Sequence, residues 1–196
     1  MSPSDPAPLR AEMRARRAAL TPALRIAAAQ QVAARLHALP MPASGHVAGY
    51  WAVDGEIALH AWQVALPSGL TYCLPRLHED GRLRFAPWRA GDALVANRFG
   101  IPEPDVAPER CLEAASLALA VVPLLAFDAT CHRIGMGGGW YDRTFAFRRE
   151  AQCAPMLVGA GYEIQRVEAI EPASWDVRLD AVCTESATYF RDPTPA

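Results

Sequence analysis

The segment RIGMGGGWYD, residues 133–142, places four glycines within five positions, between an arginine and an aspartate. These glycines are Gly135, Gly137, Gly138 and Gly139. Because glycine lacks a side chain, backbone N–H groups in such a segment can approach a ligand closely, and successive N–H groups can bind an anion. Arg133 at its start and Arg143 just beyond it add positive charge. The spacing predicts a phosphate-binding loop that contains no lysine.

Asp142 stands directly after the glycines and two aromatic residues. A carboxylate there would repel a phosphate unless a Mg²⁺ ion bridged the two groups, so its position predicts a metal ion. A short glycine pattern is weak evidence on its own, and a tight turn without a ligand is the alternative interpretation. The context favours the phosphate, because an apolar run at 117–123 predicts a strand before the loop and 140–150 a helix after it.

The chain contains no lysine, so all 19 of its basic side chains are arginine. This excludes a P-loop nucleotide site, which needs its lysine, and Schiff-base chemistry on a lysine amine. Any contact between a cationic side chain and an anionic ligand must come from arginine, a planar donor suited to phosphates and carboxylates.

The 196 residues, 52% hydrophobic and with a net charge of −2, suit one domain with a substantial core. The charge balance argues against general nucleic-acid or membrane-surface binding, and the N-terminus lacks the order of a secretory signal, so we expect a cytoplasmic protein. The five cysteines are widely spaced without a CxxC pair, which argues against a disulfide framework and a zinc site.

The elements that must position the glycine loop follow an alternating pattern. Loosely held residues 1–8 precede two predicted helices, the second opening at an N-cap, Thr21, followed by Pro22. Further helices are predicted at 57–66 and 140–150, and an ordered loop at 97–105. Strands are predicted at 46–53, 70–77, 82–88, 117–123 and 155–162, with one or two short strands within 180–190.

This alternation predicts an α/β fold with a largely parallel sheet, in which 117–123 is the central strand. Ligands of such sheets gather at the loops that follow the carboxyl ends of the strands. Two loops qualify here: the DGE turn, 54–56, and the long segment 124–139. Without further context, Glu56 in the first loop would be an ordinary solvated turn residue.

The stretch VVPLLAFDATCHRIGMGGGWYDRTF, residues 121–145, resembles the signature of the 5-formyltetrahydrofolate cyclo-ligases, also called methenyltetrahydrofolate synthetases. Other stretches match the family in the family's order, over most of the chain: LRAEMRARRAAL, YWAVDGEIALH, YCLPRL, GIPEPD and WDVRLDAVCTES. The resemblance implies one domain over 1–196, with a central mostly parallel sheet flanked by helices. Such a fold is Rossmann-like and similar to that of the NagB, RpiA and CoA-transferase enzymes.

The resemblance also implies a reaction: ATP- and Mg²⁺-dependent conversion of 5-formyltetrahydrofolate, with or without a polyglutamate tail, to 5,10-methenyltetrahydrofolate, with release of ADP and phosphate. In the family's mechanism the formyl oxygen attacks the γ-phosphate of ATP, N10 closes the ring, and phosphate leaves. Phosphorylation is chemically reasonable, since an amide oxygen is otherwise a poor leaving group. Positioning and charge stabilisation would supply most of the catalysis. The family also implies a monomer.

Matching positions carry the family's roles onto this sequence. The resemblance implies catalytic roles for Arg133, Tyr141 and Asp142. It implies nucleotide contacts from Arg10, Arg133, Ile134, Gly135, Met136, Gly137, Gly138, Gly139, Trp140 and Tyr141. It implies folate contacts from Trp51, Glu56, Met136, Gly137, Gly138, Gly139 and Trp140, with Glu56 holding the pterin. It implies Mg²⁺ ligands at Asp142 and Asp180.

Three positions depart from the family pattern. Pro6 replaces a lysine, so either phosphate affinity is lower or Arg14 substitutes for it. Leu124 and Cys131 replace glycines, and a residue with a side chain resists positive φ. These departures motivate an alternative function, a diverged homologue that binds folate or nucleotide without turnover. A different enzyme on a similar scaffold, acting on a sugar phosphate or CoA, has no supporting motif.

Overall fold

The computed structural model describes residues 7–149 and 154–192. Its α-helices are α1 (Ala7–Ala18), α2 (Pro22–His37), α3 (His60–Val64) and α4 (Trp140–Thr144), and its 3-10 helices are η1 (Pro108–Arg110), η2 (Ala114–Ser116), η3 (Ala146–Arg149) and η4 (Glu163–Gln165). Its strands are β1 (Gly45–Ala48), β2 (Leu70–Leu77), β3 (Leu83–Pro87), β4 (Leu94–Ala96), β5 (Pro102–Pro104), β6 (Leu117–Pro123), β7 (Ala126–Phe127), β8 (Arg133–Ile134), β9 (Met156–Ala160), β10 (Ala181–Cys183) and β11 (Thr188–Phe190).

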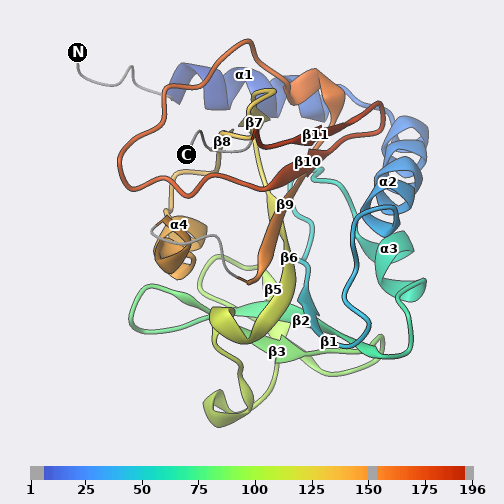
Figure 1. Cartoon of the computed structure of the whole chain (residues 1–196), viewed down its shortest axis with the longest axis vertical. Helices are drawn as coiled ribbons and strands as arrows, with labels where there is room; N and C mark the ends of the chain where they lie inside the picture. Colours follow the sequence, from blue (N-terminus) through green and yellow to red (C-terminus); the bar gives the residue numbers. More distant parts are fainter. Residues whose placement is uncertain (1–6, 150–153, 193–196) are drawn as a thin grey trace.

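Seven strands form one sheet in the order β11-β10-β9-β6-β1-β2-β3. The five inner strands are parallel to one another, and each edge strand pairs antiparallel with its neighbour. Helices α2 and α3 lie on one side of this sheet and α4 on the other (Figure 1). The predicted α/β fold, with a mostly parallel sheet and β6 at its centre, is confirmed. The prediction that all 196 residues form one domain extends beyond the described ranges.

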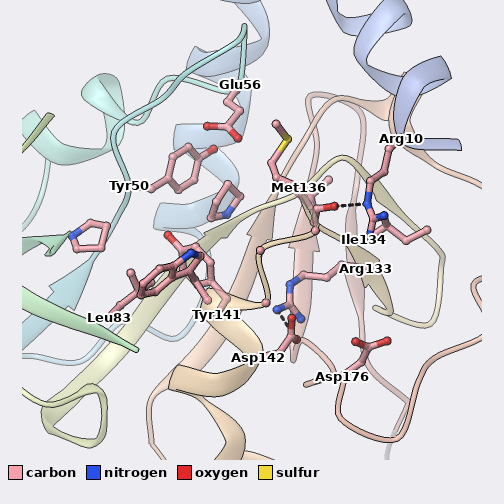
Figure 2. Close-up of a pocket in the computed structure, with 18 of the residues that line it drawn as sticks. Arg10, Tyr50, Glu56, Leu83, Arg133, Ile134, Met136, Tyr141, Asp142 and Asp176 are labelled. Carbon is pink, nitrogen blue, oxygen red and sulfur yellow. Dashed lines mark hydrogen bonds and ion pairs between the residues drawn. The ribbon is translucent and has the colours of Figure 1, made fainter. Parts of the chain in front are cut away.

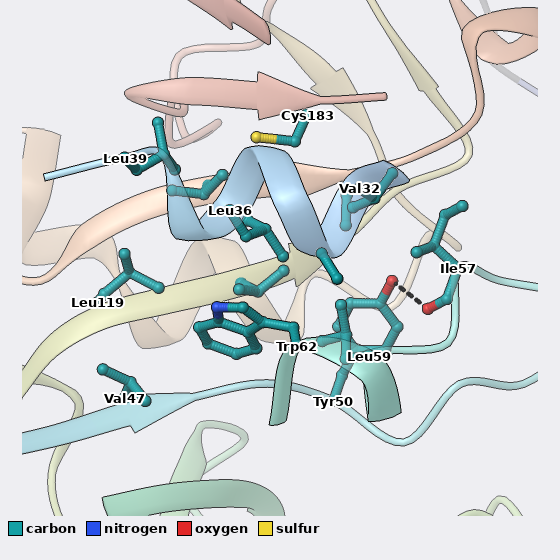
Figure 3. Packing of buried hydrophobic residues seen from close by; sticks show 14 of the residues in the cluster. Val32, Leu36, Leu39, Val47, Tyr50, Ile57, Leu59, Trp62, Leu119 and Cys183 are labelled. Atoms are coloured by element: carbon teal, nitrogen blue, oxygen red, sulfur yellow. Dashed lines mark hydrogen bonds between the residues drawn. The ribbon is translucent and has the colours of Figure 1, made fainter. Parts of the chain in front are cut away.

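Alternate residues of β6 enter hydrophobic cores on opposite faces of the sheet, as the two-residue period of a strand requires. Leu119 and Val121 join the core beneath α2 and α3, where Trp62 is fully buried (Figure 3). Ala120 and Val122 join the core on the α4 side, which includes Phe145. Helices on both faces bury the central strand, which explains its uninterrupted apolar run.

Three predicted elements are shorter in the structure. The strand predicted at 46–53 ends at Ala48, and Tyr50 then turns into the core, where its hydroxyl donates to the Ile57 carbonyl (2.9 Å). Of the helix predicted at 57–66, only α3 (His60–Val64) is helical. The helix predicted at 140–150 is present as α4, which ends at Thr144. The Thr144 hydroxyl bonds to the Trp140 carbonyl and accepts from Leu83 N–H (2.8 Å), which ties the end of α4 to β3.

Other predictions are confirmed with small changes at their ends. Strands 70–77 and 82–88 form the β2–β3 hairpin, 155–162 contains β9, and the chain's last two strands are β10 and β11. The N-cap at Thr21 is present, since its hydroxyl accepts from Leu24 N–H (3.3 Å). The predicted loop 97–105 contains strand β5, which pairs with β4.

The chain's first residues differ in part from prediction. Residues 1–6 lie outside the described ranges, but Ala7 and Pro8 form the first turn of α1 rather than a loose segment. A proline is tolerated there because the first turn of a helix does not need its N–H. Within the described ranges, no helix combines the length and apolar character needed to cross a bilayer.

Candidate functional site

A cavity of about 540 Å³ opens where the loops that follow β1 and β6 meet helix α1, strands β2 and β3 and the β4–β5 connection. Its lining includes both loops that sequence analysis selected, the DGE turn and the glycine segment. The predicted nucleotide, folate and catalytic residues that line it are Arg10, Trp51, Glu56, Arg133, Ile134, Gly135, Met136, Gly137, Gly138, Gly139, Trp140, Tyr141 and Asp142. Figure 2 shows Glu56 and Asp142 at different ends of this cavity, with Met136 and Tyr141 between them.

The glycine segment leaves strand β8 and reaches α4 through two residues at positive φ, Gly137 (98°) and Gly139 (64°). A side chain on either glycine would be strained there. Gly139 is the residue before α4, which has five residues instead of the eleven predicted. A helix dipole from so short an element is weak, so backbone N–H groups and arginines must supply most of the attraction for an anion.

Two arginines lie against the glycine segment within the cavity. Arg10 on α1 donates from Nε to the Gly135 carbonyl (2.9 Å). Arg133 donates to the Val177 carbonyl and forms an ion pair with Asp142 (Nη2–Oδ1 2.7 Å). Both side chains are therefore fixed in place before any ligand arrives, which lowers the entropic cost of binding an anion.

Arg143, predicted to help hold a phosphate, has a different role in the structure. It donates to the carbonyls of Gly138 (2.9 Å) and Gly81 (2.8 Å), and its guanidinium lies over the Trp140 ring. It is not among the residues that line the cavity. Its contacts brace the outside of the glycine segment instead. Arg14, the suggested substitute for a missing lysine, is exposed and also lies outside the lining.

The two predicted metal ligands have different surroundings. Asp142 lines the cavity, and both of its hydrogen bonds, from Arg133 and Val177 N–H (3.1 Å), are accepted by Oδ1. Asp180 is not part of the lining, and its carboxylate accepts from Arg148 and from Leu157 N–H (2.8 Å). Across 7–149 and 154–192, no three His, Cys, Asp or Glu side chains form a group that could hold a metal ion.

Glu56 is held at the other end of the cavity by the turn that follows β1. Its carboxylate accepts from Val53 N–H (Oε2, 3.1 Å), and only 7% of the side chain is exposed. Burial raises the pKa of Glu56 to about 7, although the Val53 N–H and the Arg17 guanidinium act in the opposite direction. Such a carboxylate is a strong acceptor for paired N–H donors. Trp51, which also lines the cavity, is 37% exposed and packs edge-on against Trp88.

Tyr141 lies between the two ends and stacks against Phe145, with ring centroids 6.3 Å apart. Burial, aided by the charge of Glu56, raises the pKa of Tyr141 well above its usual value. The phenol is therefore neutral at physiological pH and can donate a hydrogen bond, but cannot act as a phenolate base.

Two further segments line the cavity that sequence analysis did not assign to it. The β4–β5 connection contributes Asn97, Phe99 and Ile101, and the segment before β10 contributes residues from 169 to 176. Phe99 and Trp175 are large aromatic side chains, 57% and 63% exposed. Large aromatic residues within turn-rich segments were the signal available for these positions, since a loop has little reason to carry them for its own packing.

Comparisons with known proteins identify the family of this chain. A sequence profile of the 5-formyltetrahydrofolate cyclo-ligase family matches residues 4–185. The 5-formyltetrahydrofolate cyclo-ligase of Escherichia coli K12 is 35% identical over 181 residues, 90% of this chain and 98% of the relative. The Haemophilus influenzae protein of the same name is 34% identical over 175 residues, which are 87% of this chain and 92% of the relative.

Solved structures show the same fold. The 5,10-methenyltetrahydrofolate synthetase of Aquifex aeolicus superposes with a TM-score of 0.79 at 25% identity, over 97% of this chain and 95% of the other. The Mycoplasma pneumoniae synthetase superposes with a TM-score of 0.70 at 20% identity, over 92% and 99%. With the profile match and the close relatives, these superpositions lead to one conclusion: the chain belongs to the 5-formyltetrahydrofolate cyclo-ligase family.

Proposed function

We propose that this protein catalyses the ATP- and Mg²⁺-dependent cyclisation of 5-formyltetrahydrofolate to 5,10-methenyltetrahydrofolate, with release of ADP and phosphate. The observation that carries the proposal is the continuous cavity, which has a buried carboxylate at one end and a glycine segment with fixed arginines at the other. Phosphorylation of the formyl oxygen requires both substrates to meet, and one cavity with these two ends provides for that.

The two ends suit the two substrates. The pterin of a folate presents adjacent N–H donors, for which Glu56 is an acceptor, and Trp51 offers an aromatic surface in the same cavity. The triphosphate of ATP is a polyanion, for which Arg10, Arg133 and the glycine N–H groups are donors. Between them the Tyr141 hydroxyl can donate a hydrogen bond to a developing negative charge on the reacting groups.

A Mg²⁺ ion fits the site through Asp142. Its Oδ1 accepts both hydrogen bonds, which leaves Oδ2 for an ion, and Mg²⁺ commonly binds through one or two carboxylates plus substrate phosphates. When bound, the ion would neutralise phosphate charge. Asp142 is thus our proposed ligand. A role for Asp180 stays a prediction, and would require its carboxylate to bind the ion while Arg148 remains paired with it or moves away.

The two non-glycine residues near the loop are accommodated, which favours an active enzyme over the alternative of binding without turnover. Cys131 adopts φ 69°, the backbone conformation a glycine would take, and is fully buried. Leu124 fills space that Gly159 and Gly161 leave open, since a Cβ on either glycine would lie within 2.8 Å of its methyl groups. Pro6 lies outside the described residues.

A turnover assay tests the proposal. Purified protein mixed with 5-formyltetrahydrofolate and Mg·ATP should produce methenyltetrahydrofolate, detected by its near-ultraviolet absorbance, with one ADP formed per folate cyclised. Omission of ATP, or chelation of Mg²⁺, should stop product formation. Tight folate binding without product would instead support the non-catalytic alternative. We also propose a cytoplasmic monomer without a nucleic-acid or membrane partner, and gel filtration tests its monomeric state.

A further inference from the structure

Arg17 is a fully buried arginine near the cavity that the proposed mechanism does not use. Its residue exposure is 0%, and none of its three guanidinium nitrogens has a hydrogen-bond partner within the described part of the chain. A guanidinium does not lose its proton in a protein, so this burial carries a large desolvation cost. A charge kept in such a place needs a reason other than stability.

Helix α1 explains how the charge reaches this position. Met13 and Arg17 are its two buried residues, four positions apart and hence on one face. Arg10, at the other end of the same helix, holds the glycine segment through Gly135. One helix thus places a cation at each end of the cavity. Arg10 lines the cavity, whereas Arg17 lies behind the lining.

The acid nearest to this guanidinium is Glu56. Nη1 of Arg17 lies 4.0 Å from Oε1 of Glu56, and both side chains are more than nine-tenths buried. The separation is too long for a hydrogen bond, but an opposite charge within this range strongly favours the ionised form of a carboxylate. Oε2 of the same carboxylate is fixed by Val53 N–H. Arg17 is therefore the cationic side chain that opposes neutralisation of Glu56 by burial.

We propose that Arg17 is a positioning residue, which favours the ionised form of Glu56 so that its carboxylate can accept hydrogen bonds from N–H donors of the folate's pterin. The assignment of the pterin to Glu56 rests on the proposed function. The N–H donors of a bound pterin favour a charged carboxylate, but the same ligand displaces water from it, and that loss of hydration disfavours ionisation. The buried cation offsets that effect without itself touching the ligand.

Other groups around Glu56 do not replace Arg17. Asp54, in the same turn, opposes ionisation of Glu56 because it carries the same charge. The phenols of Tyr50, Tyr141 and Tyr162 feel the charge of Glu56, but each has a raised pKa and stays neutral at physiological pH. Arg25, from α2, lies against Gly55, but its guanidinium donates to the last carbonyls of α1. It is not among the charged groups that shift the pKa of Glu56.

Titration of Glu56 in the ligand-free protein tests this inference independently of the proposed function. Carbon-13 NMR of glutamate carboxyl groups, with Glu56→Gln to assign the signal, should place the wild-type pKa near 7. In Arg17→Met we expect the midpoint to rise by roughly one pH unit or more. Arg17→Lys, which keeps the charge, should stay near wild type, as should Arg16→Met, which removes an exposed arginine from the same helix.

Kinetics supply a second measurement. At pH 7, Arg17→Met should raise the KM for 5-formyltetrahydrofolate by roughly tenfold. At pH 9 the KM of the variant should return most of the way to the wild-type value, because Glu56 then ionises without the Arg17 charge. The kcat at saturating folate and the KM for ATP should change less than about twofold. A merely structural role for Arg17 would not produce a defect that high pH repairs.

Two results would overturn the inference: an unchanged Glu56 titration in Arg17→Met, or a KM defect that is the same at pH 7 and pH 9. If Arg17→Met does not fold, as judged by circular dichroism, Arg17→Gln carries the same test, because it also removes the charge. If wild type neither binds nor converts the folate, the proposed function fails, while the Glu56 titration still decides whether Arg17 controls this carboxylate.

Discussion

The two ends of the cavity would recognise their ligands by opposite means. At the Glu56 end, one buried carboxylate is fixed by Val53 N–H and a cation behind it. At the glycine end, the proposed ligand contacts are backbone N–H groups and two arginines. Arg10 is held by a backbone carbonyl, and Arg133 by a backbone carbonyl and by Asp142. One end concentrates its chemistry in a single titratable group, whereas the other distributes it over many fixed donors.

This difference follows from the ligands proposed for each end. A flat neutral heterocycle is distinguished by a few directional donors, which a single desolvated acceptor can match strongly. A triphosphate is distinguished by charge spread over many oxygens, which several donors must share. We therefore expect substitutions at the Glu56 end to impair folate binding in a pH-dependent way. Substitutions at the glycine end should affect nucleotide use and loop geometry.

Asp142→Asn should produce the largest effect. The substitution keeps the shape but weakens both the proposed metal contact and the ion pair that fixes Arg133. We expect kcat to fall about 100-fold or more, a typical result for loss of a charge-stabilising group, while folate affinity changes little. Steady-state kinetics at varied Mg²⁺, with Asp105→Asn as an exposed control, provide the measurement. Full turnover in Asp142→Asn would show that the metal assignment is wrong.

Glu56→Gln should show the reverse pattern. The amide cannot offer two anionic acceptors, and loss of hydrogen bonds to a charged group costs about 1.5–3 kcal/mol. We expect the KM for 5-formyltetrahydrofolate to rise roughly 10- to 100-fold, with the KM for ATP within about twofold of wild type. Glu79→Gln, at an exposed position, serves as the control. Equal increases in both KM values would contradict the separation of the two ends.

The same substitution should stabilise the protein above neutral pH. Burial raises the pKa of Glu56 from its ordinary 4.5 to about 7, so between these values the folded protein binds more protons than the unfolded chain. The stability contributed by this residue therefore falls as pH rises through that window. Urea denaturation should show Glu56→Gln more stable than wild type by roughly 2 kcal/mol at pH 8, and nearly equal at pH 4. A gain of equal size at both pH values would contradict this origin.

How far the sequence predicts the structure differs between the two ends. Apolar runs predicted β2 and β6 with their observed bounds, since burial on both faces of a strand leaves a clear signal. The glycine segment can be predicted from residue types alone, because its backbone adopts positive φ at Gly137 and Gly139, which favours glycine. By residue type alone, Glu56 is an ordinary turn residue, and only the family resemblance predicts that it binds the folate. Its burial arises from long-range packing, which no local pattern encodes.

Arg17 and Arg143 show the same limit for charged residues. Each stands among several arginines or beside a predicted site, so residue type and spacing do not distinguish their roles. The packing of α1 buries Arg17 behind Glu56, and the Gly81 carbonyl, together with Gly138 and Trp140, holds Arg143 outside the cavity. Contacts between residues 39 and 62 positions apart in the chain decide both cases.

The smallest expected effect separates the backbone of the glycine segment from its side-chain contacts. Gly139→Ala places a Cβ at φ 64° and within 2.7 Å of the Arg143 guanidinium, so we expect a loss of about 1–2 kcal/mol in the free energy of unfolding. Gly135→Ala is the matched change in the same segment, since no atom lies within 4 Å of its added Cβ and its φ is not positive. Thermal unfolding should therefore show a lower Tm for Gly139→Ala and little change for Gly135→Ala. If both variants lost the same stability, the segment would not depend on the left-handed conformation at Gly139, and its glycines would have to be explained by ligand access alone.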